Sequence, residues 1–140
     1  MARVEAELLE GRRVVFTARG RSQVNVRQVG GDGQPIGFTS VELLLIALAN
    51  CTLGEVSNSP ALAGLDSPNL RVTLESSMAR DPLRVAKIGV TVELDGDAIE
   101  GAREGLLATA SGCPVANTLR FSPEIEVTVR ARNAAGGAAR

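Results

Sequence analysis

The sequence predicts an α+β fold with the element order β-β-β-α-β-β-α-α-β. Three observations carry this prediction: several short segments alternate apolar with polar residues, one long apolar stretch follows a helix-start signal, and strands and helices do not alternate regularly. The chain has 140 residues without an internal repeat or a linker, which predicts a single domain over residues 1–132. Residues 133–140 are small and polar, and we expect them to form a disordered tail.

The N-terminal part is expected to form three consecutive antiparallel strands. Apolar residues alternate with polar ones over residues 4–8, and a second strand over 14–17 follows a turn at 10–12. A third strand is expected over residues 24–29. The glycine-rich segment 30–35 that comes next has the composition of a loop.

A long helix is expected after this loop. Thr39 is a favourable N-cap residue, and Glu42 stands three residues later, where it completes a capping box. Nearly every residue from 41 to 53 is apolar, so this helix should be buried on most sides, by a sheet and by other helices or a second subunit. The sequence Asn-Ser-Pro at 58–60 should end it.

The second half of the chain is expected to contain a hairpin, two helices and a last strand. Alternation over residues 70–74 and 86–94 predicts two strands, which an Asp-Pro step at 81–82 would connect. Residues 125–129 alternate in the same way and predict the last strand.

Asp97 is expected to cap the second helix, with Glu100 at its capping-box position and Gly112 as its end. Cys113 and Pro114 then mark the start of a short third helix.

Composition excludes several classes of function. The formal charge is −1, which gives no support to binding of nucleic acids or anionic membranes. No apolar run is expected to approach the roughly 18 residues of a membrane span, and the charged N-terminus does not resemble a signal peptide, so we expect a cytoplasmic protein. The chain has no histidine, which excludes Ser-His-Asp and Cys-His catalysis within one chain. We expect neither a metal site nor a cofactor.

The remaining reactive side chains are Cys51 and Cys113. Cys51 lies inside the apolar helix and is either a small core residue or a reactive thiol. Glu55 shares its helical face, and a nearby carboxylate raises the pKa of a thiol. Cys113 begins a predicted helix, where backbone N–H groups stabilise a thiolate. Paired cytosolic thiols are more often catalytic or redox-sensing than structural, but sequence spacing alone does not show that these two meet.

Glu42 is a second candidate with two interpretations. Nine residues turn a helix by about 900° and advance it by about 13 Å, so Glu42 lies on the face opposite Cys51. It cannot contact Cys51 of its own helix. Glu42 therefore either serves only as part of the capping box with Thr39, or acts at Cys51 of another subunit.

Two motifs resemble the OsmC/Ohr superfamily. Residues 37–52, GFTSVELLLIALANCT, are similar to the first-cysteine helix, which in the OsmC-like branch is close to GPSPxELLLAALGGCT. Residues 111–119, SGCPVANTL, resemble the second-cysteine motif. The resemblance extends from about residue 3 to residue 130.

This resemblance implies an intertwined homodimer, with two long helices buried between sheets and active sites at the subunit interface. It also implies a thiol-dependent peroxidase that prefers organic hydroperoxides. Cys51 would be the peroxidatic thiolate and Cys113 the resolving thiol. An external dithiol, of lipoyl type or similar, would reduce the resulting disulfide.

The activating residues differ from the pattern of the peroxidase branches. Their glutamate lies one residue earlier, where this chain has Val41, and the chain carries Glu42 instead. The arginine of the family lies near the first hairpin, where Arg12 is the closest match and Arg21 the next. These differences keep open an alternative: a catalytically weak OsmC-like dimer that acts as a redox sensor or binds a small molecule.

Overall fold

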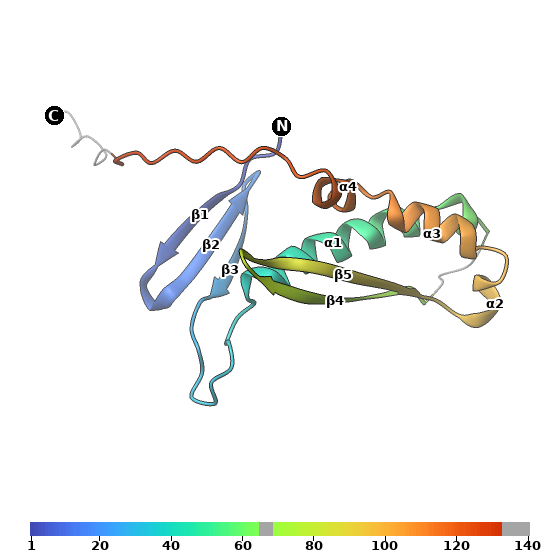
Figure 1. Cartoon of the computed structure of the whole chain (residues 1–140), viewed down its shortest axis with the longest axis horizontal. Helices are drawn as coiled ribbons and strands as arrows, with labels where there is room; N and C mark the ends of the chain where they lie inside the picture. The colour runs from blue at the N-terminus through green and yellow to red at the C-terminus, as the bar shows by residue number, and fades with distance from the viewer. Residues whose placement is uncertain (65–68, 133–140) are drawn as a thin grey trace.

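The computed structural model describes residues 1–64 and 69–132, so the expected tail at 133–140 lies outside the described residues. Figure 1 shows a three-stranded sheet at one end of the molecule and a long helix that runs beside a two-stranded hairpin. In chain order the elements are β1 (Glu5–Leu9), η1 (Glu10–Arg12), β2 (Arg13–Ala18), β3 (Arg21–Val26), α1 (Ser40–Ser57), η2 (Pro60–Leu62), β4 (Arg71–Arg80), β5 (Leu83–Glu93), α2 (Gly96–Ile99), α3 (Arg103–Ser111) and α4 (Pro114–Arg120).

The predicted N-terminal meander is confirmed. β2 pairs antiparallel with β1 on one side and β3 on the other, and Val15 lies between Glu7 and Val24 in the register. The third strand is shorter than expected because it ends at Val26. Val29 takes part only in an isolated bridge to Pro35, across the predicted loop.

The predicted start and end of the long helix are also confirmed. The Thr39 hydroxyl accepts a hydrogen bond from the Glu42 backbone N–H, and the Glu42 carboxylate accepts one from the Thr39 N–H. α1 ends with Asn58 as its C-cap, next to Ser59 and the proline that was expected to stop it. The capping box thus fixes where α1 begins.

β4 and β5 form a long antiparallel hairpin, with its turn at the expected Asp81–Pro82 step. α1 packs against β4, α3 and α4 (Figure 1). Val56 of α1 forms the centre of the core together with Leu62, Ala102 and Leu106.

The chain alone covers only one side of α1. Leu48, Thr52 and Val56 are its buried residues, so the expected burial on most sides is not provided within a single chain. α1 has 18 residues and a mean hydropathy of 1.4, so by length and composition alone it is long and apolar enough to cross a membrane. The expectation that no apolar run approaches this length is therefore wrong. Core helices of soluble proteins meet the same criterion, and α1 packs against three elements of its own chain.

The prediction of one helix from Asp97 to Gly112 is wrong in its first part. The structure divides this segment into α2 and α3, and Asp97 lies inside α2 rather than at its cap. Gly101 lies between α2 and α3, where the conformational freedom of glycine disfavours helix formation. Gly112 is the C-cap of α3, as expected.

The predicted last strand is also wrong for the isolated chain. Ile125, Val127 and Val129 are 82%, 81% and 93% exposed, and the segment runs alone past the first sheet (Figure 1). Arg132, just beyond it, reaches the Glu7 carboxylate at 3.2 Å. The segment has the alternation of a strand but no hydrogen-bonded neighbour among the described residues, and a strand exists only as a member of a sheet.

Candidate active site

The packing of α4 on α1 brings the two cysteines together, although they are 62 residues apart in the chain. Cys51 lies on α1, and Cys113 is the N-cap residue of α4. Both are free thiols, and Cys113 is close enough to hydrogen-bond to Cys51 and to influence its titration. The structure thus contains a dithiol pair between two helices.

Cys113 is the more deeply buried of the two thiols, with only 1% of the residue exposed. Its Sγ accepts a hydrogen bond from the Ala116 backbone N–H at 3.4 Å, in the way that an oxygen does at an ordinary N-cap. The Thr52 Oγ1 lies 3.9 Å from the same sulfur. Cys113 is therefore held by groups from both α4 and α1.

Cys51 is half-buried, and its surroundings in the single chain favour the neutral thiol. Burial raises the pKa of Cys51 above its ordinary value, and the neighbouring Cys113 and the Glu55 carboxylate raise it further. The backbone N–H of Val115 acts in the opposite direction, because it donates to the sulfur and lowers this pKa. The effect of Glu55 agrees with its position one helical turn after Cys51.

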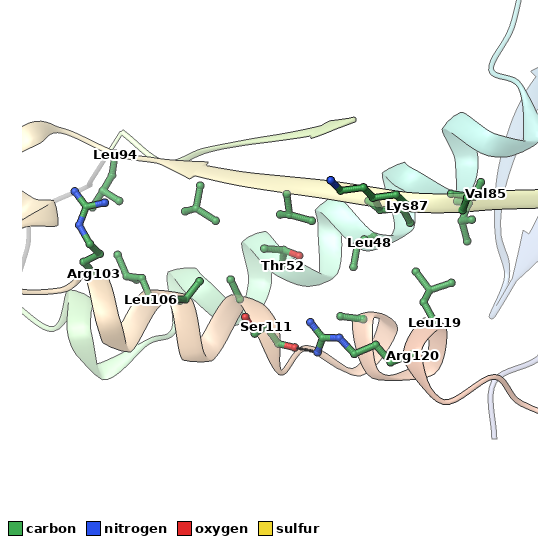
Figure 2. Close-up of a pocket in the computed structure, with 18 of the residues that line it drawn as sticks. Leu48, Thr52, Val85, Lys87, Leu94, Arg103, Leu106, Ser111, Leu119 and Arg120 are labelled. Carbon is green, nitrogen blue, oxygen red and sulfur yellow. Dashed lines mark hydrogen bonds between the residues drawn. The ribbon is translucent and has the colours of Figure 1, made fainter. Parts of the chain in front are cut away.

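An open groove of about 850 Å³ is lined by Thr52 but by neither cysteine. Figure 2 shows Lys87 of β5 on one wall, Arg103 and Arg120 on the opposite wall, and Thr52 of α1 between them. Most other lining residues are aliphatic. The Arg120 guanidinium donates to the Ser111 carbonyl oxygen at the end of α3. The groove is thus an apolar surface with cationic edges.

The other candidate residues lie elsewhere in the chain. Glu42 is part of the capping box, and the hydrogen bond that its carboxylate accepts from the Thr39 backbone N–H is the main cause that lowers the pKa of this carboxyl group. Arg12 donates from Nε to the Arg27 carbonyl oxygen at 2.8 Å, and Arg21 is exposed at the start of β3. Within residues 1–64 and 69–132, no hydrogen bond or ion pair joins any of these three side chains to a cysteine. A role at Cys51 therefore requires a second subunit.

Thr52 and the backbone amides of Val115 and Ala116 are part of the site but were not singled out from the sequence. The amides had a signal, because the predicted start of a helix at Cys113 places free N–H groups there. For Thr52, the only signal in the sequence is its position next to Cys51. Its contact with Cys113 depends on how α4 packs, which no local pattern specifies.

Comparisons with known proteins agree with this fold. Among solved structures, the chain is similar to a candidate osmotic stress induced and detoxification response protein from Psychrobacter arcticus 273-4, with a TM-score of 0.69 and 20% identity over 84% of this chain and 88% of that one. An OsmC like protein from Mycoplasma pneumoniae gives a TM-score of 0.67 and 19% identity, over 87% and 89% of the two chains. A hypothetical protein from Aquifex aeolicus VF5 gives 0.69 and 17%, over 87% and 89%.

These identities are low, so the three structures support the fold alone. No curated protein matches the chain. The family model of the OsmC-like protein matches residues 30–128, a span that contains both cysteine motifs and the elements from α1 to α4. The chain therefore belongs to the OsmC-like protein family.

Proposed function

We propose that this protein is a thiol-dependent peroxidase that reduces organic hydroperoxides. The observation that carries the proposal is the pairing of a half-buried thiol, Cys51, with a fully buried thiol, Cys113. The more accessible sulfur suits the attack on a substrate, and the buried one suits the second step, which occurs inside the protein. The Val115 N–H favours negative charge on Cys51.

The proposed reaction has three balanced steps. The Cys51 thiolate attacks one oxygen of the hydroperoxide, the O–O bond breaks, and the products are a sulfenic acid on Cys51 and an alkoxide that takes up a proton. The Cys113 sulfur then attacks the Cys51 sulfur, and the hydroxyl leaves as water with a proton. An external dithiol reduces the disulfide by exchange and becomes oxidised itself.

The surroundings of Cys51 support an organic substrate. The residues that flank it at helical spacing are Ala47, Leu48 and Gly54, which offer no polar side chain, whereas Glu55 contributes a negative charge. The alkyl or aryl part of a hydroperoxide gains contact with such a surface, while hydrogen peroxide gains nothing from it.

Exposed apolar surface supports a dimer. The groove along α1 and the solitary segment 125–129 are the apolar surfaces that a partner would cover. We infer that the subunits are intertwined, so that segment 125–129 joins a sheet and α1 becomes buried.

The same dimer would supply the activating charge. Within one chain the pKa of Cys51 is raised by burial, Cys113 and Glu55, so the thiol needs a nearby cation to react rapidly at neutral pH. Arg12 and Arg21 are the candidates for that cation, and Glu42 of the other subunit is the candidate that orients it.

The test is a single-turnover measurement on the full reduced chain. One equivalent of cumene hydroperoxide should convert both thiols into one intramolecular disulfide, and dihydrolipoamide should restore them. Cys113→Ser should stop at a dimedone-reactive sulfenic acid, and Cys51→Ser should consume no peroxide. Two thiols that stay titratable after this treatment would exclude the peroxidase.

Light scattering should give twice the chain mass, and a stable folded monomer would exclude the dimer.

The raised pKa of Cys51 favours a second candidate, a redox sensor with the same fold. A sensor would form the same disulfide slowly and would not turn over with a dithiol. The rate of peroxide consumption in the presence of excess dihydrolipoamide separates the two functions, because only the peroxidase sustains it.

A further inference from the structure

We propose that Thr52 positions Cys113 for its attack on Cys51, so that this threonine controls the resolving step and not the attack on peroxide. The inference rests on the proposed dithiol function and adds a residue to it. It concerns a side chain that neither cysteine motif assigns to the chemistry.

The contact itself carries the proposal. Thr52 is fully buried, with 0% of the residue exposed, and its Oγ1 lies 3.9 Å from the Cys113 Sγ. No buried side-chain oxygen or nitrogen among the described residues lacks a hydrogen-bond partner. The sulfur is thus the partner that satisfies a hydroxyl buried in an otherwise apolar helix, and loss of that hydroxyl removes a bond to the resolving thiol.

The position of Thr52 links this contact to the other sulfur. It directly follows Cys51 on α1, so one rigid helical turn carries both the sulfur to be attacked and the hydroxyl that holds the attacking sulfur. The Ala116 N–H holds Cys113 from the side of α4. Contacts from two helices thereby fix the direction from which Cys113 approaches.

The hydroxyl also suits the chemistry of the step. Cys113 must lose its proton, form the S–S bond and displace the hydroxyl of the Cys51 sulfenic acid, which leaves as water. A hydroxyl can accept from the S–H group before the proton leaves and donate to the sulfur afterwards. A valine has the same shape but can do neither.

The test compares Thr52→Val, which removes the hydroxyl, with Thr52→Ser, which retains it. Thr109→Val is the matched control, since Thr109 is a partly buried helical threonine that bonds to Ser59 and Gly105 and not to a sulfur. Each variant is mixed with one equivalent of cumene hydroperoxide, quenched at intervals and analysed by mass spectrometry for thiol, dimedone adduct and disulfide.

We expect Thr52→Val to lose its first thiol at the wild-type rate and to form the disulfide about fivefold to tenfold more slowly, the effect of one lost hydrogen bond. The sulfenic acid should accumulate, and excess peroxide should convert more of it to sulfinic acid. Thr52→Ser and Thr109→Val should behave as wild type. Disulfide formation at the wild-type rate in Thr52→Val overturns the proposal, as does an equal slowing in Thr109→Val.

A second arm replaces the peroxide with diamide, which adds to one thiol across its N=N bond and is then displaced by the other thiol as a hydrazine. The displacement uses the same Cys113 attack and needs no peroxidase activity. If wild type reacts with diamide but not with the hydroperoxide, the proposed function fails while Thr52 is still tested. An unchanged displacement rate in Thr52→Val then rejects the positioning role by itself.

Discussion

The Asn25 side chain binds both backbone polar atoms of Phe38, although the two residues belong to separate segments. Its Nδ2 donates to the Phe38 carbonyl oxygen at 2.9 Å, and its Oδ1 accepts from the Phe38 N–H at 2.8 Å. Asn25 is buried in β3, and Phe38 directly precedes the N-cap of α1. This pair of hydrogen bonds therefore attaches the start of α1 to the first sheet.

We predict that Asn25→Ala lowers the free energy of unfolding by about 2–3 kcal/mol, because it removes two hydrogen bonds and leaves two backbone groups without partners. Urea unfolding followed by circular dichroism measures the change. Gln23→Ala, at an exposed site on the same strand, is the control and should stay near wild type. Equal stability of the two variants would contradict the structural role of Asn25.

Gly37 lies where the segment that precedes α1 comes close to the backbone of β3. A Cβ at this position would lie 2.5 Å from the Val26 carbonyl oxygen and 2.6 Å from the Asn25 Oδ1, which is too close for any side chain. Gly37→Ala should therefore destabilise the protein by about 1–3 kcal/mol. Gly31→Ala meets no atom within 4 Å and should be neutral in the same unfolding experiment. A neutral Gly37→Ala would show that the loop can move away at no cost.

Elements with local signals at their ends were predictable from the sequence. Thr39 and Glu42 fix the start of α1 through contacts within four residues, and Gly112 ends α3 in the same local way. Segment 125–129 shows where such reasoning fails. Alternation describes one strand, whereas a strand also needs a neighbour, and the chain itself supplies none among the described residues.

In the candidate site too, the sequence predicts what depends on local signals but not what depends on packing. The absence of histidine left Cys51 and Cys113 as the reactive side chains, and the resemblance connected them, but their proximity depends on the packing of α4 against α1. Thr52 could not be found from the sequence, because a threonine in an apolar helix has no periodic or spacing signal. Its partner lies 61 residues away in the chain.

The position of Glu55 predicts an effect on the reactivity of Cys51. Burial is the main cause of the raised pKa of Cys51, and the negative charge of Glu55 adds to it. Glu55→Gln removes that charge, so the pKa should fall and the pH profile of Cys51 alkylation by iodoacetamide should move to lower pH. The measurement is made on Cys113→Ser, which leaves one thiol. Glu93→Gln on β5 serves as the control, and a profile that Glu55→Gln leaves unmoved would contradict the assignment.

The capping box predicts a pH dependence of stability in acid. The hydrogen bond from the Thr39 N–H to the Glu42 carboxylate is the main cause that lowers the pKa of Glu42 below the ordinary value of 4.5, so the folded chain holds this proton more weakly than the unfolded chain. The contribution to stability is complete above pH 4.5 and is lost as the pH falls through the folded pKa. Glu42→Gln should have a melting temperature close to wild type near neutrality and a smaller decrease in acid. Equal acid sensitivity of the two proteins would contradict the prediction.

Mixed dimers distinguish the capping role of Glu42 from a catalytic one. Gln also completes a capping box, so Glu42→Gln should melt near the wild-type temperature at neutral pH. If the Glu42 charge orients an arginine beside Cys51 of the other subunit, the same variant should react with organic peroxide more slowly by on the order of tenfold. Cys51→Ser should be inactive.

Subunit exchange between these two variants should restore activity. In the proposed dimer, a mixed pair has one site with an intact Cys51 from the first variant and an intact Glu42 from the second. If exchange is random, half of the dimers are mixed and each has one competent site, so the rate should reach about a quarter of the wild-type value. Exchange is verified by mass spectrometry under native conditions. If mixed dimers form and the rate does not exceed that of Glu42→Gln alone, Glu42 does not act across the interface. A wild-type rate in Glu42→Gln itself would leave the capping bonds to Thr39 as the role of Glu42.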